Sequence, residues 1–488
     1  MASLVKKAVR GAAWTIGSSM TGRMIGMFGT IIITRFLAPS VVGEVAVAHL
    51  LMHSARRLST LGFGQYVVAT KDLKSNDISQ ISALHLVTGL VAFAILWFLA
   101  KPLSPWLKAP TMYLFMPGML LSGFIDRLVF MPEKVLVREL RFKAISLTRA
   151  SSEILYTAVT ITGAAFLDWG GHAIVAGNLA RSILTALVFL TVVKWSSWFP
   201  SFKFKKERLK DVYEFGWPLW VSTNAHFFSR SWDSLLFSKF FGAGAMGNYN
   251  LAYNLASIPS AQVGEHIGDV LLPSFAKMKA EQKMSALLRA TGLLSLLIFP
   301  LAVGLGAVSE TVVATVLSPE WQGVAPYLLI LSVLSVVRPI SWNINSYLQS
   351  QRKTKTLMIL SLQKMALLLV CIVGLSRWGD LWACVGVGIA FGFHTLASIW
   401  VVHKHDNISL SSMFKMMSGP LLACVPMALA VFATRRLSIE PLWLRLILEI
   451  GVGAVVYLGA AFVFSNAIAK DFLHLLKKAF GNTGNDSK

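Results

Sequence analysis

Basic and acidic residues recur at helical spacing inside otherwise apolar stretches of this chain. His49, His53, Arg56 and Thr60 occupy positions i, i+4, i+7 and i+11 of one stretch, so they share one helix face. An ionisable side chain at mid-membrane costs about 2.5–3.5 kcal/mol on insertion scales, so such a face must contact protein or water. Arginine suits phosphate, because its planar guanidinium binds two oxygens at once and stays protonated. The pattern predicts a wet, cationic cleft between helices.

Other stretches carry further polar stripes of the same kind. Their members are Arg149, Glu153, Tyr156 and Thr160, then His226, Arg230 and Asp233, and then Arg338, Trp342 and Asn345. Amide side chains in these stretches can hydrogen-bond a polar ligand. We therefore expect these candidate substrate-binding residues: Arg23, Arg56, Arg149, Arg181, Arg230, Arg338, Asn224 and Asn345. The candidates for ion coupling are Asp233, Glu153 and His226.

Structural roles are the alternative for several of these residues. Arg149 with Glu153, and Arg230 with Asp233, have spacings at which they can neutralise each other. Arg56 and Arg57 lie close to the end of their stretch, from which long side chains can snorkel to the membrane surface. Four further charged residues of the apolar stretches are interpreted as structural: Asp126, Arg127, Lys364 and Arg445. For His49, His53 and His226, a role in packing or hydrogen bonding is favoured over proton coupling.

The composition fits a membrane protein with many spans. Of 488 residues, 55% are hydrophobic and 14% are charged, yet the formal net charge is +22. Nucleic-acid binders carry far more charge, and a soluble chain this apolar could not cover its surface with polar groups. The cysteines Cys371, Cys384 and Cys424 all lie in apolar runs, which excludes a secreted disulfide scaffold.

A transmembrane helix needs about 20 apolar residues, and the sequence contains about fourteen stretches of that length. Twelve is the competing count. An all-α membrane protein is therefore expected. The ranges are 12–35, 41–65, 78–100, 111–131, 144–167, 172–193, 214–238, 247–272, 286–308, 322–349, 356–376, 381–402, 416–434 and 442–466. With both termini cytoplasmic, the inner segments hold 28 of the 45 Lys and Arg residues and the outer segments hold 7. No cleaved signal peptide is predicted, because the residues after Lys6, Lys7 and Arg10 are rich in Gly, Ser and Thr.

The chain also contains an internal repeat. A shift of 204 residues aligns the segment 35–48 with 239–252, and it pairs Phe36 with Phe240 and Gly43 with Gly247. That shift equals six spans, so the two halves have the same orientation and form a parallel repeat, as in transporters with two rocking lobes. The expected division is a six-helix lobe at 1–193, a linker at 194–213, a second six-helix lobe at 214–402, two additional helices at 403–466 and a cytoplasmic tail at 467–488. The basic, aromatic linker either lies on lipid headgroups or is solvated.

Several segments resemble a known family. They are KKAVRGAAW at 6–14, TRFLAPSVVGEVAVA at 34–48, LSTLGFGQYVVA at 58–69 and EFGWPLW at 214–220. The chain is similar over nearly its whole length to the polysaccharide-exporting branch of the MOP transporter superfamily, the Wzx-type lipid-linked oligosaccharide flippases. The resemblance implies movement of an undecaprenyl-pyrophosphate-linked sugar repeat unit across the bacterial inner membrane. It also implies membrane lipids, a polysaccharide polymerase and chain-length proteins as partners, and no nucleic acid.

Other function classes are disfavoured by what the sequence lacks. It has no Walker loop and no Cys/His cluster with zinc spacing, so neither a cofactor nor a metal is predicted. A membrane glycosyltransferase or polymerase would need catalytic acids on a large outer loop, whereas the outer loops are short. The remaining alternative is a cation-coupled drug antiporter of the same fold, for which acidic residues should dominate the cleft. Here basic residues outnumber acidic ones within the spans.

Overall fold

The computed structural model describes residues 25–70, 73–139, 141–201, 206–260, 275, 278–351, 353–437 and 439–481. Almost all of this part of the chain is helical, and it contains no strand. The predicted site residue Arg23 and the first half of the first predicted span lie outside these residues. The all-α class predicted from the sequence is confirmed.

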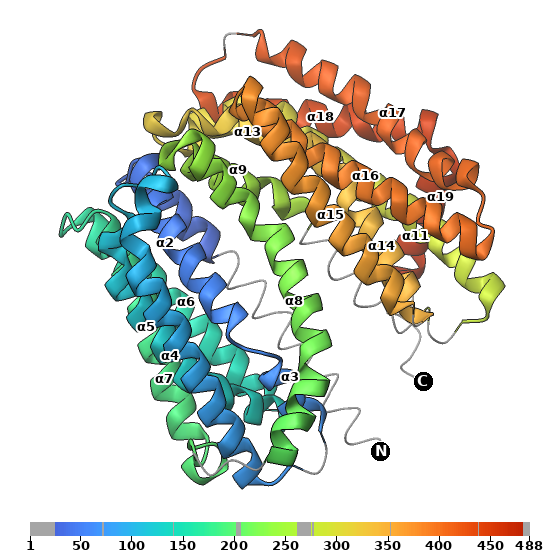
Figure 1. Cartoon of the computed structure of the whole chain (residues 1–488). Coiled ribbons are helices and arrows are strands. Elements are labelled where there is room, and N and C mark those ends of the chain that lie inside the picture. The colour runs from blue at the N-terminus through green and yellow to red at the C-terminus, as the bar shows by residue number, and fades with distance from the viewer. Residues whose placement is uncertain are drawn as a thin grey trace. The chain divides into compact units, whose positions relative to one another are not determined.

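The chain forms two compact units, Met1–Gly247 and Asn248–Lys488. Within the first unit, α5 contacts α2, α4 and α7, and α6 packs along α7 (Figure 1). The helices of this unit are α2 (Pro39–Leu58), α3 (Phe63–Ala69), α4 (Ser75–Trp106), α5 (Met112–Arg138), α6 (Phe142–Ala165), α7 (Gly171–Val192), η1 (Trp195–Ser197) and α8 (Lys206–Phe241). Helix α9 (Ala243–Ser260) begins in the first unit and continues into the second.

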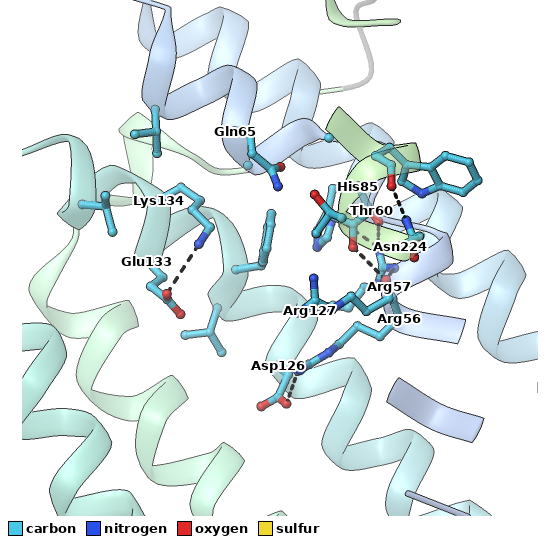
Figure 2. A pocket seen from close by; sticks show the side chains of 18 of the residues that line it. Arg56, Arg57, Thr60, Gln65, His85, Asp126, Arg127, Glu133, Lys134 and Asn224 are labelled. Atoms are coloured by element: carbon cyan, nitrogen blue, oxygen red, sulfur yellow. Dashed lines mark hydrogen bonds and ion pairs between the residues drawn. The ribbon is translucent and has the colours of Figure 1, made fainter. Parts of the chain in front are cut away.

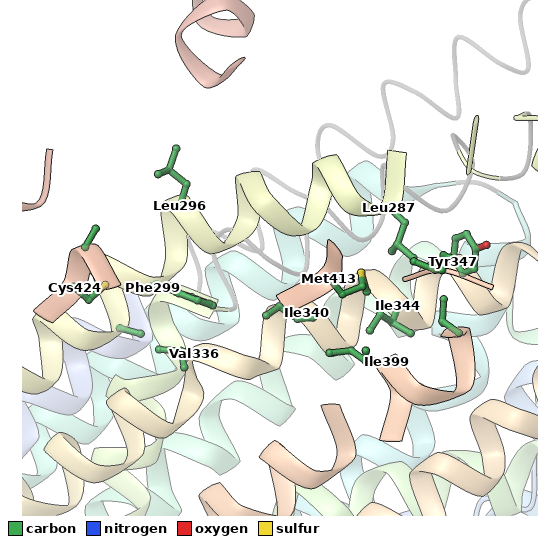
Figure 3. Close-up of a cluster of buried hydrophobic side chains, with 14 of the residues drawn as sticks. Leu287, Leu296, Phe299, Val336, Ile340, Ile344, Tyr347, Ile399, Met413 and Cys424 are labelled. Carbon is green, nitrogen blue, oxygen red and sulfur yellow. The ribbon is translucent and has the colours of Figure 1, made fainter. Parts of the chain in front are cut away.

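In the second unit, α11 contacts α13, α14 and α17, and α17 packs along α18. Its elements are α11 (Ala280–Ala307), α12 (Ser309–Val316), η3 (Pro319–Trp321), α13 (Val324–Leu334), η4 (Ser335–Val337), α14 (Arg338–Ser350), α15 (Thr354–Leu375), η5 (Ser376–Trp378), α16 (Asp380–Asp406), α17 (Leu410–Arg435), α18 (Leu442–Phe464) and α19 (Asn466–Gly481). Buried side chains from α11, α14, α16 and α17 form the main apolar core of this unit (Figure 3).

Two predicted spans depart from a regular α-helix. The span predicted at 41–65 divides into α2 and α3, because Leu61 and Gly62 have positive φ angles of 46° and 76°, which end a right-handed helix. Within the span predicted at 322–349, the 3₁₀ turn η4 tightens the helix locally, and Val324–Ser350 is still one helix long enough to cross a membrane. Pro339 follows in the first turn of α14, where its missing N–H is tolerated.

Nine helices in the described residues are long and apolar enough to cross a membrane. Large apolar side chains on them are exposed, including Phe98 at 77%, Val455 at 71% and Val463 at 75%. Such exposure is expected where lipid rather than water surrounds the helix. The chain is therefore a multi-pass membrane protein. The count of fourteen remains a prediction, since α2, α6, α8 and α9 are more polar and fall outside the nine.

The repeat is visible in how equivalent helices begin. Helix α2 starts at Pro39 and α9 at Ala243, which is the predicted shift of 204 residues. Helices α4 and α11 both begin with a backbone N–H donated to a side chain three residues on, from Lys74 to Asp77 and from Lys279 to Gln282, each at 3.2 Å. Helix α8 packs on α2 and α3 and therefore belongs to the first compact unit. The repeat instead placed most of this helix in the second predicted lobe, 214–402. The lobe limits therefore stay a prediction.

Candidate anion-binding cavity

A cavity of about 700 Å³ opens within the first unit (Figure 2). It is lined by residues of α2 to α8, among them the polar side chains of Thr60, Gln65 and Asn224. Its charged lining comprises five basic residues, Arg56, Arg57, Arg127, Lys134 and Arg149, and two acidic residues, Asp126 and Glu133. The wall thus carries an excess of three positive charges, which favours an anionic occupant.

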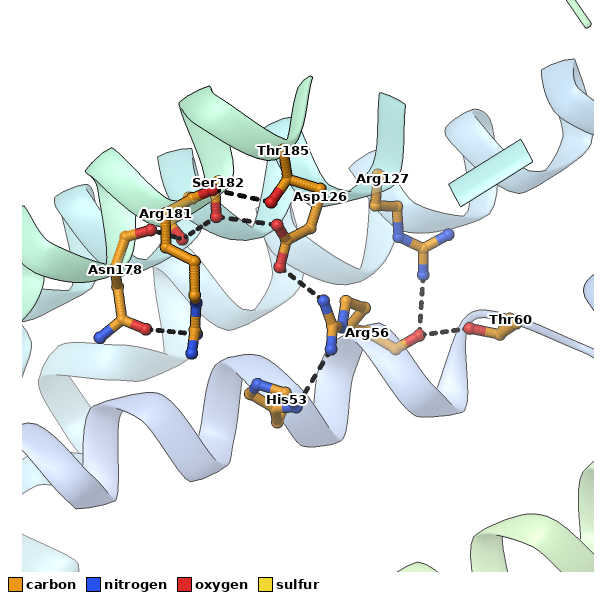
Figure 4. A network of polar contacts seen from close by, with 10 residues as sticks. His53, Arg56, Thr60, Asp126, Arg127, Asn178, Arg181, Ser182 and Thr185 are labelled. Carbon is orange, nitrogen blue, oxygen red and sulfur yellow. Dashed lines mark hydrogen bonds and ion pairs between the residues drawn. The ribbon is translucent and has the colours of Figure 1, made fainter. Parts of the chain in front are cut away.

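Arg56 is held by a carboxylate on the neighbouring helix. Its Nη1 lies 2.6 Å from Asp126 Oδ2, and its Nη2 lies 3.3 Å from His53 Nδ1 (Figure 4). The other Asp126 oxygen accepts a hydrogen bond of 2.8 Å from Ser182 on α7. Asp126 therefore fixes the direction of the Arg56 guanidinium and neutralises its charge.

Arg127 is buried, with 2% of its surface exposed, yet it bonds only neutral groups. It donates to the Arg56 carbonyl oxygen at 2.9 Å, to the His85 carbonyl oxygen and to the Ser59 hydroxyl. The guanidinium packs against the bare Cα of Gly89, where any added Cβ would overlap it. Its Nε is buried with no partner among the described residues. Because none of these contacts cancels the charge, Arg127 contributes a full positive charge to the cavity wall.

Arg57 also lacks a carboxylate partner among the described residues. Its guanidinium carbon lies 5.3 Å from the ring centroid of Phe227 on α8, a cation–π contact. Trp220, seven residues before Phe227 on α8, donates its indole N–H to the Leu58 carbonyl oxygen at 2.9 Å. This bond satisfies a carbonyl at the end of α2 and holds an aromatic ring at the cavity wall.

Arg149 does not pair with Glu153, as its sequence spacing allowed. Arg149 Nη2 lies 2.8 Å from Glu133 Oε1 on α5, and Lys134 Nζ lies 3.6 Å from the same oxygen. Helix α5 continues to Arg138, past the predicted span end at 131, so Glu133 and Lys134 lie on a helix rather than in a loop. Two cations thus share one carboxylate at this side of the cavity.

Arg181 and Glu153 form a network outside the cavity lining. Arg181 Nη1 lies 3.6 Å from Glu153 Oε2, its Nη2 donates to Asn178 Oδ1 at 2.6 Å, and its guanidinium lies over the Tyr156 ring at 5.3 Å. Ser182, the next residue of α7, bonds Asp126, so this network continues to Arg56 (Figure 4). These two predicted site residues are placed beside the cavity wall rather than on it.

Three predicted residues lie on α8, whose side chains are described only in part. Asn224 is 4% exposed and lines the cavity. Asp233 is 1% exposed, and its Oδ1 accepts the Ser234 backbone N–H at 2.8 Å. The side chains of His226 and Arg230 lie outside the described residues.

Arg338 and Asn345 belong to the second unit. Arg338 is 8% exposed, and its guanidinium carbon lies 4.7 Å from the Tyr253 ring centroid and 4.1 Å from that of Phe391. Asn345 is half-buried, two turns further along α14. The structure thus gives Arg338 an aromatic setting that the sequence did not reveal.

Sequence reasoning missed three cations of the wall. Arg127 was interpreted as structural and Arg57 as reaching the membrane surface, and Lys134 lay beyond the predicted span 111–131. One available signal was that Arg127 has no acidic residue three or four positions away on its own helix, where Gly123, Phe124, Phe130 and Met131 stand. A buried arginine without a local partner must be satisfied by another element or by a ligand.

The chain matches the family model described as "Polysaccharide biosynthesis protein" over residues 32–326. It is 23% identical to the teichuronic acid biosynthesis protein TuaB of Bacillus subtilis (strain 168), with 98% of this chain and 99% of that protein aligned. It is also 23% identical to the lipopolysaccharide biosynthesis protein WzxC of Escherichia coli (strain K12), with 80% and 78% aligned.

Among solved structures, the chain is similar to the lipid II flippase MurJ in an inward closed conformation. The TM-score is 0.75, the identity is 14%, and 92% of this chain and 98% of that chain are covered. The structural likeness establishes the fold, and the family model covers more than half of the sequence. The chain therefore belongs to the polysaccharide biosynthesis protein family, and its fold is that of the lipid II flippase MurJ.

Proposed function

We propose that this protein is a flippase for an undecaprenyl-pyrophosphate-linked oligosaccharide repeat unit. It moves this unit from the cytoplasmic to the periplasmic leaflet of the bacterial inner membrane, with both termini cytoplasmic, for the synthesis of a surface polysaccharide. The observation that carries the proposal is the cavity whose five basic and two acidic side chains leave three positive charges in excess. Relatives concerned with teichuronic acid and lipopolysaccharide biosynthesis support it.

The arginines without a carboxylate partner are proposed to attract the pyrophosphate. Arg57 and Arg127 are free of carboxylates among the described residues, whereas Arg56 and Arg149 are paired with Asp126 and Glu133. A pyrophosphate can bind Arg57 directly, and it gains charge-assisted hydrogen bonds without breaking an ion pair. Arg127 is buried, so it attracts the pyrophosphate through its charge alone. Arg56 and Arg149 stay in their ion pairs.

The first sugars are proposed to lie against the α8 wall of the cavity. Trp220 offers an aromatic face, and Asn224 and Thr223 are neighbouring polar side chains on the same helix. Sugar rings bind aromatic faces through their C–H groups and bind amides and hydroxyls through their O–H groups. The apolar polyprenyl tail stays in lipid, where it needs no polar partner.

Alternating access is the proposed transport cycle, because a parallel repeat of two lobes allows a central site to face either side. Asp233, Glu153 and His226 are the proposed groups for ion coupling. Polymerase and chain-length proteins are proposed to receive the product.

The excess of cations in the cavity weighs against a cation-exporting antiporter, whose site would need acidic residues to neutralise its substrate.

Reconstitution tests the function directly. The purified protein is placed in liposomes with a fluorescent undecaprenyl-pyrophosphate oligosaccharide, and a membrane-impermeant quencher reports the leaflet that holds the label. We expect transbilayer movement, and we expect Arg57→Gln to slow it about tenfold, which corresponds to about 1.4 kcal/mol. Arg377→Gln is the matched control, since Arg377 is an exposed arginine of η5 in the second unit. Absence of movement under every imposed ion gradient would refute the function, and equal rates for Arg57→Gln and wild type would refute the role of the cavity.

A further inference from the structure

The helix α19 is amphipathic, and its one acidic side chain, Asp471, is bonded to helix α11. Its inward face includes Ile468 and Phe472, which pack against the apolar core of the second unit. Asp471 accepts two hydrogen bonds from Arg289 on α11, at 2.7 Å from Nε and 2.6 Å from Nη2. The only acid of α19 is therefore neutralised within the protein.

The outward face of α19 is consequently cationic. Lys470, His474 and Lys477 stand at positions i, i+4 and i+7, and all three are exposed. The exposed apolar residue Leu473 lies beside this stripe, because it is three residues after Lys470 and four before Lys477. A helix with a basic stripe bordering an apolar one is suited to the boundary between lipid headgroups and acyl chains.

An apolar groove of about 630 Å³ meets α19 at one end. Ala469, Phe472 and Leu473 line that end, and Val308, Val312 and Glu449 line the other, with α11 and α18 forming the walls. The lining from Glu449 to Phe462 on α18 extends about 20 Å at 1.5 Å per residue. One leaflet of a bilayer has an apolar depth of about 15 Å, so the groove can hold one extended acyl chain.

We infer that the groove and the α19 stripe together bind one anionic phospholipid of the cytoplasmic leaflet. The headgroup phosphate lies against Lys470, His474 and Lys477, and an acyl chain lies along α11 and α18. Charge complementarity selects an anionic headgroup, because Asp471, the one acidic residue of α19, is already neutralised by its two hydrogen bonds from Arg289. The apolar lining selects a hydrocarbon chain. The inference concerns the second unit alone, and only its assignment to the cytoplasmic leaflet rests on the orientation given with the proposed function.

Lipid-dependent thermal unfolding of the full chain in detergent tests this inference. A ligand that binds the folded state raises the melting temperature. We expect phosphatidylglycerol to raise it by about 2–4 °C more than phosphatidylcholine does. The double variant Lys470→Glu with Lys477→Glu should lose this difference. The control variant Lys194→Glu with Lys355→Glu should keep the difference between the two lipids. It reverses the charge of two exposed lysines away from α19, one just before η1 and one on α15.

The groove is tested separately by filling it. Ala454 lines the groove and is exposed, so Ala454→Trp blocks the acyl chain without disturbing buried packing. Val455→Trp is the matched control, because Val455 is 71% exposed and lies outside the groove lining. Ala454→Trp should lose the phosphatidylglycerol effect and Val455→Trp should retain it. Equal stabilisation by both phospholipids would overturn the inference. So would stronger stabilisation by undecaprenyl phosphate at the same residues, which would assign the groove to a polyprenyl lipid.

Discussion

Gly43 of α2 and Gly247 of α9 are in backbone contact, and they occupy equivalent positions of the internal repeat. A Cβ added to Gly43 would overlap the Ala243 carbonyl oxygen, and one added to Gly247 would overlap the Pro39 carbonyl oxygen. Pro39 and Ala243 are themselves equivalent, since each is the first residue of its helix. The contact is therefore reciprocal, as a two-fold relation between equivalent helix starts requires.

Alanine at either glycine should destabilise the protein. Gly43→Ala and Gly247→Ala each force the two backbones apart, and overpacking of this kind costs about 1–3 kcal/mol. Because the contact is reciprocal, the two substitutions should have similar effects on the melting temperature in detergent. Gly244→Ala is the control, since a Cβ there meets nothing within 4 Å. A melting temperature for Gly43→Ala equal to that of Gly244→Ala would contradict the close contact.

Replacement of Arg127 by lysine should weaken anion binding although it keeps the charge. A single ammonium cannot reach the Arg56 carbonyl, the His85 carbonyl and the Ser59 hydroxyl together, so the cation loses its fixed position. Inorganic pyrophosphate is expected to compete with the fluorescent substrate. For Arg127→Lys we expect the inhibition constant to rise about tenfold, or about 1.4 kcal/mol. Arg377→Lys should leave it unchanged, and an unchanged constant in Arg127→Lys would remove Arg127 from the site.

The pair of Arg56 and Asp126 should show measurable energetic coupling. The side chains are 31% and 23% exposed, so solvent screens the interaction in part. A double-mutant cycle with Arg56→Gln and Asp126→Asn, read by thermal unfolding, should give a coupling of about 1 kcal/mol. Asp126→Asn alone should also increase pyrophosphate affinity, because it frees the Arg56 charge. Additive effects in the cycle would show that the pair contributes nothing to stability.

Docking of α19 should weaken in acid. The two hydrogen bonds from Arg289 lower the pKa of the Asp471 carboxyl below its usual range. A carboxyl with a depressed folded-state pKa contributes stability above its unfolded pKa of about 3.9 and loses it as the pH falls through the folded value. Hydrogen exchange of α19 amides should therefore be protected evenly from about pH 5 to 8, and protection should decrease below about pH 4.

The asparagine variant isolates this effect. Asp471→Asn cannot form the ion pair, so α19 should exchange faster at neutral pH and show no further loss in acid. Amides of α16, which carries no part of this pair, serve as the internal reference. An acid-dependent loss of α19 protection that persists in Asp471→Asn would assign the pH effect to another group.

Most of the fold follows from local sequence. Apolar length places the helices, because a membrane span must satisfy its own backbone within one segment. The shift of 204 residues predicts the repeat, and the equivalent starts of α2 and α9 agree with it. The break at Leu61–Gly62 and the 3₁₀ turn η4 escaped prediction, since hydropathy averages over windows that a turn of two or three residues does not change.

For the cavity, the sequence determined less and the tertiary structure determined more than for the fold. The sequence by itself determined that cations outnumber acids inside the spans and that several must avoid lipid, because the cost of burying a charge is a property of each residue type. Only the tertiary structure decided which cations are neutralised by a carboxylate and which are not. Arg149 meets Glu133 and Arg56 meets Asp126 on other helices, while Arg127 meets carbonyl and hydroxyl groups. Ion pairing depends on distances of a few ångströms between helices, and sequence separation within one helix carries no information about them.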